Sequence, residues 1–267
     1  VYDNGTLLGS VSADGTGAWR FTPETPLAAG PHSLTTTVTD AAGNRGDESE
    51  PLNFTVETTP PPVADDLVLS NDSSGTLVTV TNGTTSDTTP VLSGTAAAGS
   101  TVTVLDGTTV LGSVVVDDGG TWRFTPESPL SEGPHSLTAT VTSPAGNVSE
   151  PSAALVFTVD TIPPAAAGEL QLSNNDGETP LPVDNGVTNT TSPVLSGSAE
   201  PGALITVSNG DTVLGSVTAD TDGNWSFTPE APLPEGDYSL TTTVTDPAGN
   251  VSAPSAPLNF TIDTTAP

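Results

Sequence analysis

Cysteine and methionine are absent from the 267 residues, and basic side chains are nearly absent. The lack of cysteine excludes disulfide bonds, zinc–thiolate centres and thiol nucleophiles. Lysine and arginine number 3 against 32 aspartate and glutamate residues, which leaves a formal net charge of −29. Such a field repels phosphate backbones and anionic lipid, because those partners bind through clusters of basic side chains. The composition therefore argues against nucleic acid and against a bare membrane surface as partners.

Long apolar runs, a secretory signal and helical periodicity are missing as well. No stretch approaches the length of about 18 apolar residues that a membrane-spanning helix needs. Charged residues make up only 13% of the chain, so the composition is not that of a disordered or coiled-coil protein. The length by itself favours two domains, each large enough to bury a core of its own.

An internal repeat is the strongest feature of the sequence. Trp19, Trp122 and Trp225 follow one another at intervals of 103 residues, within W-R-F-T-P-E-T-P-L, W-R-F-T-P-E-S-P-L and W-S-F-T-P-E-A-P-L. The strings A-G-N and F-T-V/I keep the same spacing. A period of this size is that of a whole small domain rather than of a solenoid unit. We therefore predict a tandem array with units at 1–57, 58–160 and 161–267.

Each unit consists of short stretches of alternating hydrophobicity, separated by Gly, Pro, Asn and Asp, as is typical of β-strands joined by turns. In the last unit they predict seven strands, at 170–172, 194–198, 204–208, 213–218, 225–228, 238–245 and 258–262. Seven strands in about 100 residues indicate an all-β, immunoglobulin-like sandwich. The first unit begins at the third strand. We expect five strands in it, with the first two supplied by a longer parent protein.

Proline-rich segments at 58–63 and 161–165 join the units. Proline fixes φ and favours extended backbone, so these linkers predict semi-rigid spacers and units that lie end to end. One sandwich with its linker then spans roughly 40 Å.

Three motifs resemble those of a known family. V-T-D-x-A-G-N-x-S, F-T-V/I-D-T-T-x-P and P-V-L-S-G-x-A-x-x-G are similar to the bacterial immunoglobulin-like repeats of giant, type I-secreted RTX and biofilm-associated surface adhesins. The resemblance covers the whole chain. It implies a non-enzymatic extender on the bacterial cell surface, tethered to the outer membrane through its parent protein and carrying a ligand-binding tip. It also implies a monomeric rod whose partners are neighbouring repeats of the same chain and Ca²⁺, which stiffens the junctions.

The expected topology places acidic residues at those junctions. Loops after the second, fourth and sixth strands of a sandwich meet at the pole where the preceding linker arrives. Carboxylate and carbonyl oxygens are the ligands that Ca²⁺ prefers, and no thiolate or suitable imidazole favours zinc or copper. The predicted ligands at the third unit are Asp160, Glu200, Asp220, Asp222 and Asp246.

The second unit has fewer carboxylates at the corresponding pole. Its predicted ligands are Glu57, Asp117 and Asp118, whereas Ala97 and Ser143 occupy the positions of Glu200 and Asp246. This difference predicts weaker calcium binding at the first junction. The alternative is that the acids are a solvated surface and that the Asp-Gly pairs are ordinary turn residues. At the opposite pole, Asp72 and the run 174–178 are either a second cation loop or an Asx-rich turn.

Other residues that suggest chemistry have structural interpretations. His32 and His135 occupy one repeat position that is Tyr238 in the third unit, which favours a ring that closes a corner of the sandwich over a catalytic base. The tryptophans are interpreted as core anchors rather than as a sugar-stacking platform. Glutamates recur after the W-x-F-T-P motif, where turn chemistry is favoured over paired-carboxylate hydrolysis; they are Glu24, Glu127 and Glu230.

Two other functions remain open at this stage. One unit of the array could bind a host glycan or protein, which exposed aromatic residues particular to that unit would favour. Neighbouring arrays could instead associate with one another in a biofilm matrix, which calcium-dependent self-association would favour.

Overall fold

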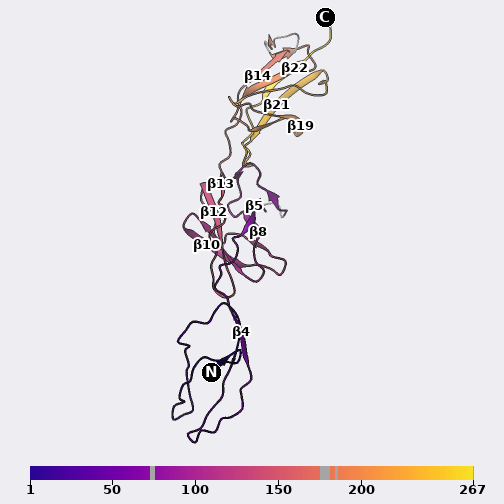
Figure 1. The fold of residues 1–267 in the computed structure, drawn as a ribbon. Coiled ribbons are helices and arrows are strands. Elements are labelled where there is room, and N and C mark those ends of the chain that lie inside the picture. Colours follow the sequence, from indigo (N-terminus) through magenta and orange to yellow (C-terminus); the bar gives the residue numbers. More distant parts are fainter. Residues whose placement is uncertain (73–75, 175–180, 184–185, 267) are drawn as a thin grey trace.

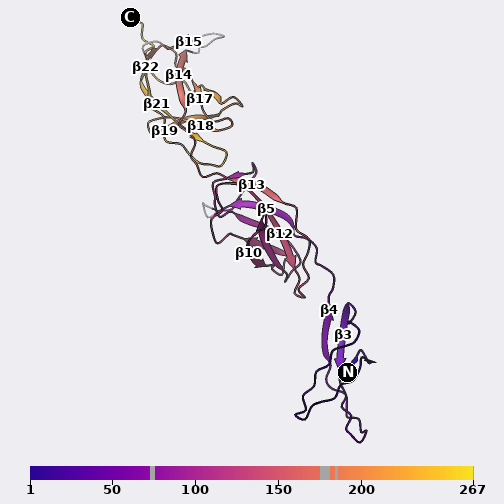
Figure 2. The same cartoon turned by 90° about the vertical axis from the view of Figure 1, so that its left-hand side faces the viewer.

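The computed structural model describes residues 1–72, 76–174, 181–183 and 186–266. The three units follow one another along a single extended line in both views, with the two termini in the units at opposite ends (Figures 1 and 2). The regular structure of the described residues consists of β-strands, without an α-helix, which confirms the expected all-β class. No helix in these ranges is long and apolar enough to cross a membrane.

The third unit is a sandwich of two sheets. Its strands are β14 (Gly168–Asn174), β15 (Leu181–Pro182), β16 (Val187–Thr188), β17 (Val194–Ser198), β18 (Leu204–Asn209), β19 (Thr212–Thr218), β20 (Asn224–Phe227), β21 (Gly236–Thr245) and β22 (Leu258–Ile262). One sheet has the order β16-β22-β21-β18-β19 and the other β15-β14-β17-β20. All seven predicted strands are present. The two strands that the sequence did not indicate, β15 and β16, have two residues each, too few to show an alternating pattern.

The second unit repeats this arrangement. Its strands are β5 (Asp65–Asn71), β6 (Val78–Thr79), β7 (Thr84–Thr85), β8 (Val91–Thr95), β9 (Thr101–Asp106), β10 (Thr109–Val115), β11 (Thr121–Phe124), β12 (Gly133–Thr142) and β13 (Leu155–Val159). The sheets have the orders β10-β9-β12-β13-β7 and β11-β8-β5-β6. Each of these two units has its own hydrophobic core between its sheets.

A tryptophan packed on a glycine explains two of the repeat motifs. Trp122 is 3% exposed and lies on β11, which pairs with β8 so that Trp122 is opposite Gly94. A Cβ atom at Gly94 would lie 2.9 Å from the indole and 2.7 Å from the Asp65 carbonyl oxygen, so only glycine fits. The third unit has the same contact between Trp225 and Gly197. The glycine of P-V-L-S-G thus provides the surface against which the tryptophan of W-x-F-T-P packs.

The first unit forms a single sheet. Its strands are β1 (Tyr2–Asp3), β2 (Thr6–Leu7), β3 (Gly30–Thr35) and β4 (Leu52–Val56), in the order β2-β1-β3-β4. The fifth strand expected around Trp19 is not formed, and the expectation was wrong here. Its ladder partner would be the equivalent of β8, which lies outside residues 1–267. Trp19 is consequently 52% exposed, although its equivalents are buried.

Candidate functional site at the unit junctions

Asp246 and Asp220 begin the turns that follow β21 and β19 in the third unit. The Oδ1 atom of Asp246 accepts a hydrogen bond of 2.9 Å from the Asn250 backbone N–H. Asp220 Oδ1 likewise accepts from the N–H groups of Asp222 and Asn224, at 2.9 and 2.8 Å. Both carboxylates therefore serve as the acceptors of Asx-type turns, which is the turn chemistry that the sequence left as an alternative.

The Asn250 side chain joins the turn after β21 to the incoming linker. Its amide nitrogen Nδ2 donates to Asp246 Oδ2 at 2.9 Å and to the Asp160 backbone carbonyl at 2.8 Å. Asp246 is only 7% exposed. The loop after the sixth strand of the sandwich thus meets the preceding linker, as the topology predicted, and an asparagine amide lies at the meeting point.

The first junction retains one part of this arrangement. Asn147, which is equivalent to Asn250, donates from Nδ2 to the Glu57 backbone carbonyl at 2.9 Å. Ser143 replaces Asp246 and accepts the Asn147 N–H at 3.3 Å. Asp117 accepts from the Thr121 N–H and hydroxyl, which lowers the pKa of its carboxyl group, while Asp118 is exposed.

The predicted calcium ligands do not form a compact cluster in this arrangement. Across the described ranges, no three Asp, Glu or His side chains gather closely enough to hold a metal ion. Two oxygens that a cation at the second junction would use, Asp160 O and Asp246 Oδ2, already accept hydrogen bonds from Asn250. Glu200 and Asp222 are exposed. As placed here, this donor set does not fit a complete calcium site, and calcium binding at these residues stays a prediction.

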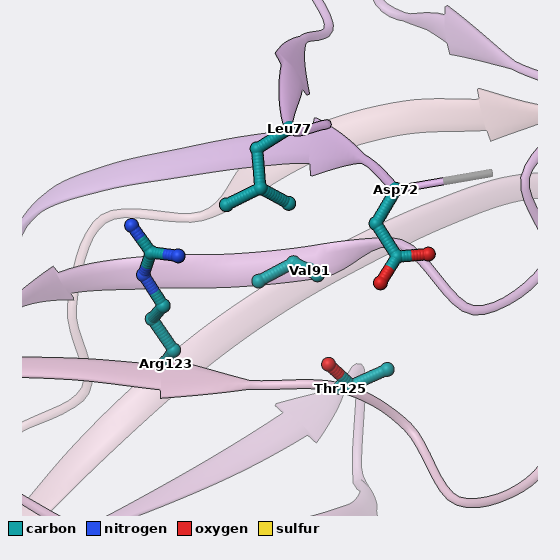
Figure 3. Close-up of a pocket in the computed structure, with 5 residues that line it drawn as sticks. All are labelled: Asp72, Leu77, Val91, Arg123 and Thr125. Carbon is teal, nitrogen blue, oxygen red and sulfur yellow. The ribbon is translucent and has the colours of Figure 1, made fainter. Parts of the chain in front are cut away.

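The opposite pole of the second unit has a small pocket beside Asp72. The pocket is lined by Asp72, Leu77, Val91, Arg123 and Thr125. Figure 3 shows the Asp72 carboxylate and the Arg123 guanidinium on opposite sides, with Leu77 and Val91 between them. The positive charge of Arg123 opposes a cation here. The third unit has serine at the position of Arg123, so this positive charge is not shared by all the repeats.

The second candidate cation loop lies largely outside the described residues. Asn174 is the only member of the run 174–178 that the structure describes, and its Oδ1 accepts the Thr188 hydroxyl. This contact joins the end of β14 to β16, which is a structural role.

The histidines close a corner of the sandwich. His135 Nδ1 lies 2.7 Å from Asp106 Oδ2, its Nε2 lies 2.8 Å from the Ser131 carbonyl, and its ring stacks on Phe157. In the third unit, Tyr238 stacks on Phe260 and donates its hydroxyl to the carbonyl four residues earlier. The interpretation of the histidines as corner rings is confirmed. What the sequence analysis missed is that their partner aspartates change together with them, to Asn209 in the third unit.

The Asp106–His135 pair has opposing effects on its two pKa values. Burial of His135 disfavours its protonated form, but the Ser131 carbonyl and the Asp106 carboxylate outweigh burial and raise the pKa of His135. Burial likewise acts to raise the pKa of Asp106, but the Ser136 N–H and His135 lower it overall. In the first unit, the Ala28 carbonyl and Asp3 raise the pKa of His32.

We expect the second unit to lose stability as the pH rises through the raised pKa of His135, above the ordinary value of about 6.5. Below about pH 6.5 the protonated His135 and the ionised Asp106 contribute fully to the free energy of unfolding. This contribution is lost again at acidic pH, where Asp106 becomes protonated. The double variant Asp106→Asn with His135→Tyr, which copies the third unit, should lose this dependence. Thermal unfolding of the second unit between about pH 5.5 and 8.5 measures it. Equal pH dependence in the two proteins would contradict the assignment.

Two junction residues of a different kind were also missed in the sequence. Glu132 accepts the N–H and hydroxyl of Thr161, the first residue of the second linker. Asn82, between β6 and β7, donates from Nδ2 to the Pro247 carbonyl of the next unit at 2.6 Å. Both residues lie in recognisable sequence patterns. Glu132 is part of P-L-S-E-G, which becomes P-L-P-E-G in the third unit, and Asn82 is part of N-G at 82–83. Their partners belong to another unit or to a linker, which a local pattern does not reveal.

Comparison with known proteins identifies the repeat. A family model described as a bacterial Ig-like domain matches residues 1–58, 59–161 and 166–264. The chain belongs to the bacterial Ig-like domain family. The sandwiches are therefore Ig-like domains in tandem, as the sequence motifs implied. A search of curated proteins gives no match.

Several solved structures are similar to this Ig-like array. A biofilm-associated protein BSP domain is 24% identical over 68% of this chain and 29% of its own, with a TM-score of 0.26. A Ca²⁺-stabilised adhesin with which an Antarctic bacterium binds ice is 21% identical over 89% of this chain and 58% of its own, with a TM-score of 0.38. A 1.5-MDa bacterial ice-binding adhesin is 19% identical over 88% and 74%, with a TM-score of 0.37.

The glutamates that recur in every Ig-like domain lie on the surface. Glu24, Glu127 and Glu230 are exposed, each next to a proline in the turn that follows the tryptophan strand position. The chain after this turn is fixed by the Leu130 N–H, which donates to the Thr88 carbonyl at 2.7 Å.

Proposed function

We propose that the chain is an extender segment of a bacterial cell-surface adhesin, which holds a ligand-binding tip of its parent protein away from the outer membrane. The observation that carries the proposal is the arrangement of the Ig-like domains, one after another along a line, with linkers that make hydrogen bonds to the following domain (Figure 1). The motifs shared with adhesin repeats and the net charge of −29, which disfavours collapse of the units onto one another, support it.

The repeats differ little in the features that a ligand-binding module would vary. The tryptophans of the two complete domains are buried, and the pocket beside Arg123 is small and carries a charge that the third unit lacks. Length and separation are thus the properties that all the repeats have in common, which favours the extender over an adhesive module.

Calcium binding at the junctions is a further part of the proposal. Its support is that two oxygens, the Asp160 backbone carbonyl and the Asp246 carboxylate, converge on the Asn250 amide at the second junction. For a cation to bind both, the Asn250 amide would have to turn away. We expect weaker binding at the first junction, where Ser143 replaces Asp246.

Small-angle scattering of the whole chain, in chelator and then in calcium, tests the proposal. An extended particle is expected in both conditions, with less flexibility in calcium. The variant Asp246→Ser, which copies the second unit, should reduce the calcium effect. A particle that is compact in both conditions would refute the extender, and a calcium effect unchanged by Asp246→Ser would refute the calcium ligands alone.

A further inference from the structure

We propose that the second junction is held by an amide and carboxylate clamp that needs no metal ion, and that the first junction lacks the glutamate contact of this clamp. The proposal deepens the extender function, on which it rests. The clamp consists of three contacts: Asn250 to the Asp160 carbonyl, Glu132 to Thr161, and Asn82 to the Pro247 carbonyl.

The first contact fixes where the linker leaves β13. Asp160 is the residue directly after β13, and its carbonyl accepts the Asn250 amide from the next unit at 2.8 Å. The same amide is held from the other side by Asp246, so it cannot turn without losing two hydrogen bonds. The side-chain amide of the equivalent Asn44 in the first unit donates to the carboxylate of its own turn, Asp40, at 2.9 Å.

The second contact fixes the next residue of the linker. The carboxylate of Glu132 accepts the Thr161 hydroxyl at 2.8 Å and the Thr161 N–H at 3.1 and 3.2 Å. Prolines follow at 163 and 164, and a proline restrains φ but not the direction in which the chain enters it. With Asp160 and Thr161 both held, the prolines extend from a fixed starting direction.

The third contact crosses between the domains without involving the linker. Asn82 is exposed on the second unit, and its Nδ2 atom lies 2.6 Å from the carbonyl oxygen of Pro247 in the turn after β21. Pro247 directly follows Asp246, so this turn is bonded to both the linker and the body of the preceding unit. Rotation of the third unit about the linker would break the Asn82 contact even if the linker itself stayed in place.

The first junction lacks this combination. Asn147 retains the contact with the linker through the Glu57 carbonyl. Ala29 occupies the position of Glu132, and its methyl side chain cannot accept a hydrogen bond. Thr58 is nevertheless present at the position of Thr161. The two linkers are therefore of similar composition but differ in how many of their residues are held.

Distances between spin labels in the intact chain test the clamp. The protein contains no cysteine, so cysteines introduced at the exposed positions Thr109 and Thr212, which are repeat equivalents in β10 and β19, label the second and third units alone. In chelator, we expect a narrow distance distribution. The double variant Asn250→Ala with Glu132→Ala should give a distribution about twice as wide, since the linker regains its freedom.

Two variants of the same chemistry serve as controls. Asn44→Ala removes an asparagine of the same motif, and Glu235→Ala removes a glutamate that bonds only residues after β22. Neither should alter the distribution, and thermal unfolding establishes that all variants are folded. A wild-type distribution in chelator as wide as that of the double variant overturns the clamp, as does a double variant as narrow as wild type. A compact particle in scattering would overturn the extender function instead, with the clamp distances still measurable.

Discussion

Replacement of Trp122 by alanine is expected to lower the free energy of unfolding of the second unit by about 3–5 kcal/mol, the usual cost of removing a buried aromatic side chain. Trp122 is 3% exposed and packs against Gly94. Because glycine has no side chain, it cannot fill the cavity that removal of the indole would leave. Because a domain of this size is stable by only about 5–15 kcal/mol, much of the unit's stability would be lost. Calorimetric unfolding of the intact chain, in which the third unit serves as internal reference, measures the change.

The matched control for this variant is Trp19→Ala in the first unit. The two tryptophans occupy the same repeat position in nearly identical sequence, yet Trp19 is 52% exposed. Its removal should change stability by less than about 1 kcal/mol, as at other exposed positions. Equal costs for the two variants would mean that the first unit buries its tryptophan, contrary to the structure.

Completion of the first sandwich should have the second large effect. If residues 59–103 are fused directly ahead of Val1, the repeat register continues without interruption, because Val104 is the equivalent of Val1. The added segment includes a copy of β8, the strand with which the segment around Trp19 would pair. We expect the first unit to gain a cooperative unfolding transition of its own, with the stability of about 5 kcal/mol or more that an independent domain shows.

Tryptophan fluorescence reports this completion directly. Burial of Trp19 should shift its emission to shorter wavelength, which is measured with the other two tryptophans replaced by phenylalanine. A fused segment of the same length but made of glycine and serine should give no shift and no transition. If the repeat-derived fusion behaved like that control, the exposed face of the first unit would not be the inner face of an Ig-like sandwich.

The fold could be predicted from the sequence because the repeat spacing, the hydrophobic alternation and the turn residues all indicated the same sandwich. The tryptophan spacing gave the repeat, and the alternation in segments such as 238–245 gave strands whose observed extent, Gly236–Thr245, differs by two residues. The strand at Trp19 was mispredicted for a physical reason. Its local sequence is that of a strand, but a strand requires a ladder partner, and local sequence does not reveal whether one exists.

The candidate site was predictable only in part. The meeting of the loop after the sixth strand with the linker followed from topology, and the contact of Asn250 with Asp160 agrees with it. The role of the asparagine was not predictable from the pattern, because an amide carries no charge that marks it as a ligand. The charged Asp246 is buried, and its carboxylate orients the Asn250 amide instead of facing solvent. The clamp residue Glu132 could have been found by comparing the units, because glutamate is present at this position in the second and third units and Ala29 replaces it in the first.

The most direct test of the central claim, that this chain is an extended spacer, is its radius of gyration in solution with chelator present. Three units of roughly 40 Å in line make a rod with a radius of gyration of about 30–35 Å. A compact protein of this length would give about 18 Å and an unfolded chain about 57 Å. The account predicts the intermediate value, with the scattering profile of a thin rod. A value near 18 Å would contradict it.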